Sequence, residues 1–441
     1  MKILQVLHSF LPHTSAGTEV YTYKLSKELS KINEVAIFFR IKEEKAKEYA
    51  LSHDKFEGLE TYSLNNTFRS CSSFEDTYAN KEIDNNFAQL LSEINPDVVH
   101  IHSLIFLSHG IVTEAKKKRI PIVFTLHDYG LLCYRGQLMK DGLAVCSGDS
   151  ILECESCLKY LLKIKKNSMR YYAFLRARSA LLLRFLKKIY FLTVKKEDNG
   201  VGKFKESSKR VCSDIDVFVA PSRFIKDKFI SSGLPEKKII YSQYGIDINP
   251  CGPKIESNIF RFGYMGTLLP LKGPAVLISA FKEMKYKNLQ LLIYGKLFRY
   301  GGFESYPESL KKLIGEDGRI KLMGGYDNKD AGKILSNIDA LVVPSTWLEN
   351  APLVIQEAFL SETPVIASRI GGIPELVIHG KNGLLFDPGD SKDLKEKMEY
   401  IIKNPGALEG FKKNIPKIKS IEENAKEIES IYADLVAKAK E

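Results

Sequence analysis

A chain of 441 residues is too long for one compact core, so the sequence predicts two domains of about 200 residues each, with a cleft between them. Hydrophobic residues make up 44% of the chain and charged residues 27%, which excludes a fibrous or wholly disordered protein. The net charge is +11, and no apolar run approaches the roughly 20 residues that a membrane-spanning helix needs. The start, MKILQVLHSF, is predicted to be a strand rather than a signal peptide, so we expect a cytoplasmic protein with reduced cysteines.

Short runs rich in β-branched residues recur along the chain, with helix-length segments between them. In the first half they are KILQVLHSF, EVAIFFRI, DVVHIHS, IPIVFTLHD, DVFVAPS and KIIYSQYG. In the second half they are FRFGYMG, LQLLIYG, RIKLMGG, DALVVPS, TPVIASR and GLLFDPG. Such runs are typical of parallel strands buried on both faces. The sequence predicts two doubly wound, Rossmann-like α/β domains, residues 1–250 and 251–418, and a terminal helix, 419–441, that packs back on the first domain.

The first loop of interest, PHTSAGTEVYTYKLSKEL, ends a strand and begins a helix. Gly17 lets the backbone come close to a bound anion, although a glycine here can also serve only to turn the chain. Neither G-x-G-x-x-G nor G-x-x-x-x-G-K-[ST] occurs in the sequence. The sequence therefore lacks the main motifs that would indicate a nicotinamide-dependent enzyme or a P-loop ATPase.

An insertion after the fourth strand, residues 133–157, carries four cysteines in the spacing C-x12-C-x7-C-x2-C: Cys133, Cys146, Cys154 and Cys157. In a reduced protein, four cysteines so close together predict either a structural zinc site or free thiols. The next segment, residues 159–210, has 16 Lys and Arg against three acidic residues, interleaved with aromatic and leucine side chains. This composition fits peripheral contact with an anionic membrane, and it equally fits an amphipathic helical pair with a solvated basic face.

The loop GYMGTLLPLKGPAVLISAF follows the first strand of the second domain. Gly266 relaxes the backbone after that strand. Lys272 comes just before Gly273 and an apolar helix, where its ammonium group can lie beside a phosphate or, alternatively, remain solvated at the surface.

The stretch STWLENAPLVIQEAFL follows the predicted strand DALVVPS. We expect Asn350 to cap a helix whose first turn tolerates Pro352, which leaves N–H groups free to meet an anion. Glu349 would lie just outside this helix and Glu357 inside it. Carboxylates accept hydrogen bonds from sugar hydroxyls but are poor neighbours for phosphate. The pattern therefore suits a nucleotide sugar whose diphosphate lies at the helix end.

The spacing E-x7-E, from Glu349 to Glu357 within LENAPLVIQEA, resembles the signature of family 4 glycosyltransferases, which have the GT-B fold. Other fragments resemble the same family in the expected order: GTEVYTYKLSKEL, VFTLHDYGLLC, FVAPSRFIKDKF, YGID, LKG and GGIPELVIHGKNGLLF. The resemblance runs from about residue 3 to residue 390. It implies a retaining transferase with two domains facing a central cleft.

The resemblance also implies the roles of individual residues. Glu349 would contact the donor sugar, Glu357 the ribose hydroxyls, and Lys272 the charge that develops on the leaving diphosphate, with no cofactor required. The donor-binding set would be Gly17, Gly266, Thr267, Lys272, Glu349, Asn350, Ala351, Pro352, Leu353 and Glu357. Thr267 departs from the family, whose members commonly carry Arg there, so Lys272 would carry more of the phosphate contact, or Arg299 or another cation would compensate.

His127, in LHDYG, is expected to face the cleft near the donor sugar and the acceptor, as the resemblance implies, or else to be a buried histidine at a strand end. We thus expect a metal-independent glycosyltransferase with Glu349, Lys272 and His127 as catalytic residues. It would use a UDP- or GDP-sugar and a lipid-linked or polysaccharide acceptor at the inner face of the cell membrane, without nucleic acid. The alternative is a non-catalytic nucleotide-sugar- or glycan-binding protein on the same scaffold.

Overall fold

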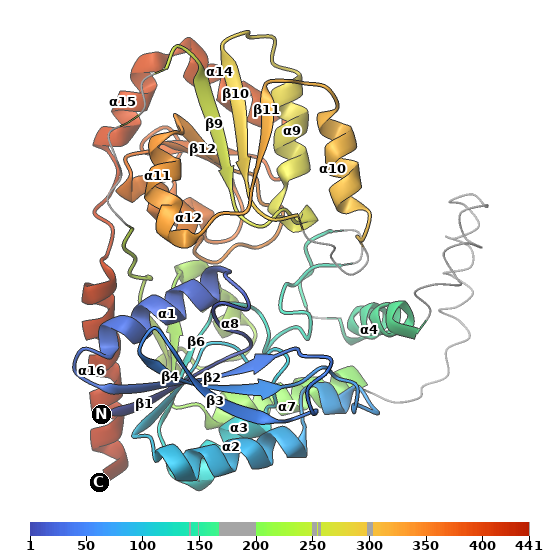
Figure 1. The fold of residues 1–441 in the computed structure, drawn as a ribbon, viewed down its shortest axis with the longest axis vertical. Helices are drawn as coiled ribbons and strands as arrows, with labels where there is room; N and C mark the ends of the chain where they lie inside the picture. The colour runs from blue at the N-terminus through green and yellow to red at the C-terminus, as the bar shows by residue number, and fades with distance from the viewer. Residues whose placement is uncertain are drawn as a thin grey trace.

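Two α/β domains lie one above the other, and a long C-terminal helix runs along the side of the first domain (Figure 1). This computed structural model describes residues 1–140, 143–148, 150–166, 200–248, 254, 257–297 and 303–440. The centre of the predicted basic segment, residues 167–199, lies outside these ranges, as do Arg299 and the predicted domain boundary at residue 250.

The amino-terminal domain is built on an eight-stranded sheet in the order β3-β4-β2-β1-β5-β6-β7-β8. Its strands are β1 (Lys2–Leu7), β2 (Glu34–Ile41), β3 (Leu51–Phe56), β4 (Leu59–Asn65), β5 (Val98–Ile101), β6 (Ile122–Thr125), β7 (Val217–Ala220) and β8 (Ile239–Tyr241). All neighbouring strands are parallel except β3 and β4, which form an antiparallel hairpin at the sheet edge. The sequence did not predict this hairpin, because four of the six residues of β3 are exposed and give no apolar run.

Helices cover both faces of this sheet: α1 (Gly17–Leu29), α2 (Lys81–Ile94), α3 (Gly110–Lys117), α7 (Gly200–Asp214) and α8 (Arg223–Ser231). Alternate residues of β1 enter two different apolar clusters. Leu4 and Val6 pack with α2, α3, α7 and α8, whereas Ile3 and Leu7 pack with α1 and the terminal helix α16 (Ile421–Lys440). This two-sided burial explains the nearly unbroken apolar run of β1. A further helix, α4 (Ile151–Lys166), belongs to the cysteine-containing insertion.

The carboxyl-terminal domain has a six-stranded parallel sheet in the order β11-β10-β9-β12-β13-β14. Its strands are β9 (Phe260–Met265), β10 (Leu289–Tyr294), β11 (Ile320–Gly324), β12 (Ala340–Val343), β13 (Val365–Ser368) and β14 (Gly383–Phe386). Its helices are α9 (Pro274–Lys282), α10 (Tyr306–Ile314), α11 (Ala331–Ser336), α12 (Leu353–Leu360), α13 (Ile373–Leu376), α14 (Ser391–Lys403) and α15 (Pro405–Lys413). The predicted doubly wound architecture is confirmed in both domains.

The strand order reverses beside β1 in the first sheet and beside β9 in the second. In open parallel sheets, ligands bind beyond the carboxyl ends of the strands at such switch points. The loops that follow β1, β6, β9 and β12 of the two sheets meet one another across the domain boundary, as the contacts below show.

Candidate active site between the domains

An ion pair links the two loops on which the sequence placed the donor. The Lys272 ammonium group lies 2.6 Å from Oε1 of Glu349, and the Ser345 hydroxyl donates to the same oxygen at 2.6 Å. Glu349 is only 5% exposed, whereas a third of the Lys272 side chain is accessible. The carboxylate is thus fixed by two donors, and the cation keeps one side open to a ligand.

Glycine makes this approach of the two loops sterically feasible. Gly273 directly follows Lys272 with a φ of +68°, and a Cβ added there would lie 1.8 Å from the carbonyl oxygen of Pro344. A Cβ on Gly371, whose φ is +60°, would lie 2.1 Å from the carbonyl oxygen of Glu349. Any larger residue at these two positions would push the lysine and the glutamate apart.

Helix α12 begins directly after this ion pair and presents its amino end to the other domain. Pro352 is the residue that precedes the helix, and the N–H groups of Leu353 and Val354 in its first turn have no acceptor within the helix. The position that a Cβ on Gly17 would occupy lies 3.8 Å from the side chain of Leu353. Ala351 packs into the apolar cluster around β1 and α1. The two predicted anion-binding helix ends therefore lie opposite each other.

Asn350 does not cap α12, contrary to the prediction, because its side chain crosses to the amino-terminal domain instead. Its amide nitrogen donates to the carbonyl of Leu126 at 2.6 Å, and its amide oxygen accepts from the Ser222 hydroxyl at 2.5 Å. Glu375, from the GGIPEL segment, accepts from the backbone N–H groups of Arg223 and Phe224 at 2.8 and 2.6 Å, at the start of α8. A side chain of one domain thus caps a helix of the other.

Glu357 lies in α12, as predicted, and is only 6% exposed. Burial raises the pKa of its carboxyl group, and the charge of Lys24 lowers it by a smaller amount. In the described part of the chain, no side chain donates a hydrogen bond to this carboxylate. A buried acceptor without donors is suited to a pair of sugar hydroxyls.

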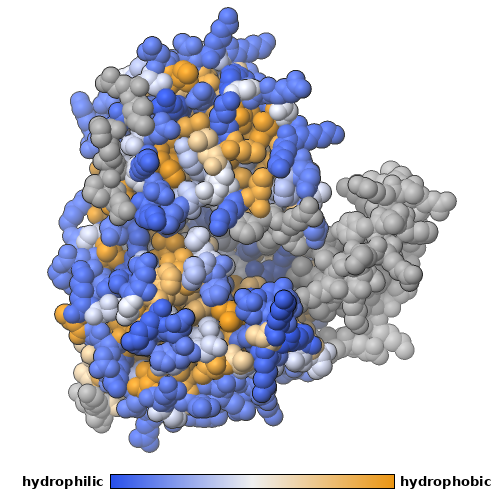
Figure 2. Space-filling view, in the orientation of Figure 1, coloured by the Kyte–Doolittle hydropathy of each residue, from blue (hydrophilic) through white to orange (hydrophobic). Residues whose placement is uncertain are grey.

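Gly266 and Thr267 follow β9 at the start of the loop that ends in Lys272. The carbonyl of Thr267 accepts from the hydroxyl of Tyr264 at 2.8 Å and from the N–H of Leu269 at 2.9 Å. Its backbone is therefore used to shape the loop. The structure thus brings together Gly17, Lys272, Glu349, Ala351, Pro352, Leu353 and Glu357 at the domain boundary, with Gly266 and Thr267 in the loop that leads to Lys272. On the face of the molecule seen in Figure 2, hydrophilic side chains predominate and apolar side chains form smaller patches.

His127 is turned into the amino-terminal domain and is 9% exposed. Its Nδ1 lies 2.6 Å from the hydroxyl of Tyr244, and its Nε2 lies 2.8 Å from Nδ1 of His102. Burial holds the pKa of His127 well below its usual range, so the ring is neutral. Because both nitrogens have partners, a hydrogen bond from His127 to a sugar would have to replace one of them. Its catalytic role stays a prediction.

The predicted zinc ligands lie on one insertion: Cys133, Cys146, Cys154 and Cys157. Arg135 Nη1 lies 3.4 Å from the Sγ of Cys157, and the Gly148 N–H donates to the Sγ of Cys146 at 3.4 Å. Burial raises the pKa of Cys154, the charge of Lys205 lowers it by a smaller amount, and the three neighbouring thiols raise it slightly further. Among the described residues, no group of three or more His, Cys, Asp or Glu side chains is arranged to hold a metal ion. Zinc therefore stays a prediction.

Three contacts of the candidate site were not predicted from the sequence. Ser345 fixes the carboxylate of Glu349, and Glu375 caps α8 across the domain boundary. The ring of Trp347 lies 4.9 Å from the Lys272 ammonium group, and its buried indole N–H has no partner among the described residues. Ser345 and Trp347 lie within the stretch STWLEN, but their contacts with Glu349 and Lys272 depend on how the two loops pack.

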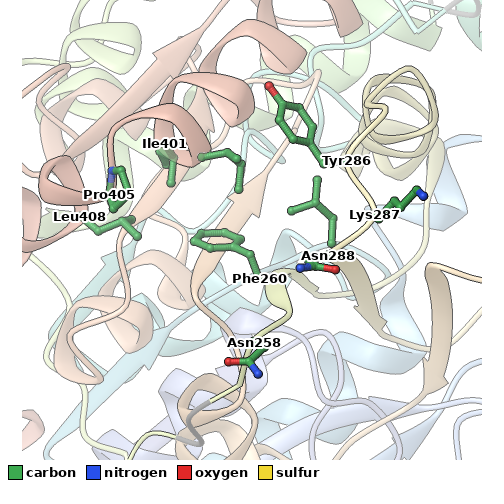
Figure 3. Close-up of a pocket in the computed structure, with 10 residues that line it drawn as sticks. Asn258, Phe260, Tyr286, Lys287, Asn288, Ile401, Pro405 and Leu408 are labelled. Carbon is green, nitrogen blue, oxygen red and sulfur yellow. The ribbon is translucent and has the colours of Figure 1, made fainter.

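A pocket of about 500 Å³ lies away from this region, at the amino-terminal ends of β9 and β10. Figure 3 shows Phe260 of β9 beside Pro405 and Leu408 of α15, with Tyr286 and Asn288 on the other side. Its lining contains few groups that could act on a substrate.

Two Rossmann-type domains with a lysine–glutamate pair and an open helix end between them define a GT-B glycosyltransferase scaffold. The family description "Glycosyltransferase Family 4" matches residues 15–191, and "Glycosyl transferases group 1" matches residues 253–418. The chain belongs to the GT-B glycosyltransferases of family 4.

Two curated relatives each match part of this chain at low sequence identity. An uncharacterized glycosyltransferase of Methanocaldococcus jannaschii is 29% identical over 44% of this chain and 52% of its own length. An uncharacterized 42.6 kDa protein in the cps region of Klebsiella pneumoniae is 25% identical over 67% of this chain and 64% of its own length. The chain thus spans about half to two thirds of the length of these relatives.

Solved structures support the fold along the whole chain. Sucrose-phosphate synthase from Thermosynechococcus elongatus has a TM-score of 0.68 at 16% identity and covers 99% of both chains. Anabaena HepE, in complex with UDP and glucose, has a TM-score of 0.66 at 18% identity and covers 98% of this chain and 99% of its own. At these identities the likeness establishes the GT-B fold alone.

Proposed function

We propose that the protein is a retaining glycosyltransferase that moves a sugar from a UDP- or GDP-sugar to a lipid-linked or polysaccharide acceptor. The single observation that carries the proposal is the ion pair between Lys272 and Glu349 beside the open end of α12. In transfer from a nucleotide sugar, negative charge grows on the leaving diphosphate. Fixed donors aimed at that charge lower the barrier.

The roles follow from the contacts. Lys272 and the N–H groups of Leu353 and Val354 would hold the diphosphate, because a cation and a helix amino end both favour anions. Glu349 would accept hydrogen bonds from the donor sugar, held in place by the Ser345 hydroxyl. Glu357 would accept from the ribose hydroxyls. Each polar part of a nucleotide sugar then has a partner of matching chemistry.

The donor base is part of the proposal. Anabaena HepE, one of the structural neighbours, is described in complex with UDP and glucose, which favours UDP-glucose as the first donor to test. Retention of anomeric configuration rests on the E-x7-E resemblance. It is tested by proton NMR of the first product formed, in which an α-linked donor should give an α-linked product.

The acceptor and the membrane contact rest on the sequence. The basic and aromatic composition of residues 159–210 supports a peripheral position at an anionic membrane, where a lipid-linked acceptor would be found. In the described part of the chain, no helix is long and apolar enough to cross a membrane. The many Lys and Arg side chains of residues 159–210 would make this contact electrostatic.

Turnover separates this function from its alternative, a non-catalytic nucleotide-sugar-binding protein. UDP-, GDP- and ADP-sugars should be screened for hydrolysis and transfer, with nucleotide binding measured by calorimetry in parallel. Glu349→Ala should abolish turnover of the accepted donor while nucleotide binding persists. Tight donor binding with no turnover in the unmodified protein, under any acceptor tested, would favour the binding protein instead.

A further inference from the structure

A second group of polar and aromatic side chains lies at the carboxyl ends of β1, β2 and β5, on the same edge of the sheet as Gly17. Arg40 is the last residue but one of β2, and Phe106 lies in the loop after β5. His8 follows β1, and its ring contacts that of Phe106 edge to face, with centroids 6.5 Å apart. His8 also lies 3.3 Å from Glu19 in the first turn of α1, two residues after Gly17. The group therefore adjoins the donor site.

The guanidinium group of Arg40 is held between two aromatic rings. Its central carbon lies 5.4 Å from the ring centre of Phe68 and 5.3 Å from that of Phe106. Its Nε donates to the carbonyl of Asn66 at 2.7 Å, and its two terminal nitrogens have no acceptor among the described residues. The nearby carboxylate of Glu48 is used by Thr67 and Arg69 instead. Arg40 is thus a half-buried cation with no ion pair in the described part of the chain.

Backbone strain marks the same place. Phe68 and Phe106 have φ values of +64° and +65°, which bulky residues rarely adopt. Asn66, only 1% exposed, fixes both segments, because its amide donates to the carbonyl of Phe106 at 3.0 Å and accepts from the N–H of Phe68 at 3.1 Å. Strain that the surroundings enforce in this way is characteristic of binding sites. The result here is a Phe106 ring that is 46% exposed beside Arg40.

Two buried polar atoms of the group have no partner among the described residues, namely Nδ1 of His8 and Oε2 of Glu19. Glu19 is 1% exposed, and its other oxygen accepts from the Thr14 hydroxyl at 2.9 Å. Buried polar groups are normally satisfied, so an unpaired donor or acceptor at this edge of the sheet indicates a missing ligand.

We propose that Arg40, Phe106 and His8 form an acceptor subsite for a saccharide that carries an anionic group, a phosphate or a carboxylate. The apolar face of the sugar ring lies on the exposed ring of Phe106. The anionic group accepts hydrogen bonds from the two terminal nitrogens of Arg40, whose planar fork matches the oxygens of either anion. A hydroxyl group of the sugar bonds to His8.

This assignment rests on the proposed function for the idea of an acceptor, but its binding chemistry can be measured without a donor. Calorimetry on the full chain should compare glucose 6-phosphate, glucuronate, glucose and inorganic phosphate. We expect one of the two anionic sugars to bind at least about 10-fold more tightly than glucose, the size of a charge-assisted hydrogen-bond contribution. The tighter binder of glucose 6-phosphate and glucuronate shows whether the subsite prefers a phosphate or a carboxylate.

Arg40→Gln should remove the preference for the anionic sugar, and Phe106→Ala should weaken binding of both charged and neutral sugars. Lys42→Gln is the matched control, since it deletes the same charge two residues away on an exposed side chain that pairs with Glu44. If Arg40→Gln lowers the melting temperature, Arg40→Lys keeps the charge but not the planar fork, and should lose most of the preference.

Equal affinity for charged and neutral sugars would overturn the assignment. The assignment would also be overturned if inorganic phosphate bound as tightly as the sugar phosphate and if Phe106→Ala did not change its affinity. That result would show a site for the ion only. UDP-glucose binding is measured in the same variants. If UDP-glucose binding persists while the sugars fail to bind, the donor assignment stands and the acceptor subsite is wrong. If the sugars bind while UDP-glucose does not, the subsite stands and the donor assignment is wrong.

Discussion

The ammonium group of Lys272 lies 2.6 Å from the carboxylate of Glu349, although the two residues come from the loops after β9 and β12. The cation proposed to meet the donor diphosphate is therefore already held by the acid proposed to meet the donor sugar. Donor binding need not recruit Lys272 from solvent. The donor diphosphate would meet a cation whose position is already fixed by Glu349, which is the condition for electrostatic preorganisation.

Removing this cation should abolish most of the catalysis and also disturb the fold. Lys272→Met should lower kcat by about 10²-fold to 10³-fold, as loss of a fixed charge-stabilising donor does elsewhere. It also strands a carboxylate that is 5% exposed, so chemical denaturation should show a loss of stability. The double variant Lys272→Met with Glu349→Gln should recover stability but not activity. Lys285→Met, on the exposed surface of the same domain, is the control.

The buried carboxylate of Glu357 should lower the stability of the fold and raise the affinity for the donor. Its pKa is raised by burial, so the folded state binds its proton more tightly than the unfolded state, and this carboxylate costs stability at pH values above its folded pKa. Glu357→Gln should therefore raise the melting temperature at pH 7 and weaken donor affinity by about 10-fold or more, since hydrogen bonds to a charged acceptor are lost. Glu362→Gln, near the end of the same helix, should do neither.

The same titration predicts a pH dependence of donor binding. Protonated Glu357 loses acceptor capacity, so nucleotide-sugar affinity should fall as the pH drops through the raised pKa of this group. Calorimetry of UDP-glucose binding from pH 8 to pH 5 tests it. A Glu357→Gln protein that keeps the same pH dependence would show that another group is responsible.

Asn350 should hold the domains together rather than start a helix. Asn350→Ala leaves the carbonyl of Leu126 and the hydroxyl of Ser222 without their cross-domain partner. This should weaken the contact between the two domains by about 1–3 kcal/mol. We expect a larger radius of gyration in solution scattering and a lower kcat/KM. Asn414→Ala changes an exposed side chain and should alter neither quantity. An unchanged scattering profile for Asn350→Ala would contradict the bridging role.

The four cysteines of the insertion give a clear analytical test. Purified protein should contain about one zinc per chain by elemental analysis if Cys133, Cys146, Cys154 and Cys157 bind it as thiolates. Cys154→Ser together with Cys157→Ser should release the metal, whereas Cys212→Ser, outside the cluster, should keep it. Protein that contains no stoichiometric zinc would leave the cysteines as free thiols.

The sequence determined the layered architecture, because strands buried on both faces leave apolar runs that need no knowledge of their neighbours. All twelve predicted strands occur, and only the hairpin of the exposed edge strand β3 and its neighbour β4 was not predicted. It also pointed to Glu349, Glu357 and Lys272 as candidates, since the E-x7-E spacing and the family resemblance that it carries are local properties of a chain.

Partner choice was decided only by the tertiary structure. Asn350 bonds to Leu126, 224 positions away, His127 turns inward to Tyr244, and Arg40 is held between rings from two other loops. A polar side chain takes the partner that packing brings within about 3 Å of it, and no local pattern carries that information. The sequence by itself therefore determined the scaffold and pointed to the proposed donor residues, whereas folding decided which side chains join the domains and which rings enclose Arg40.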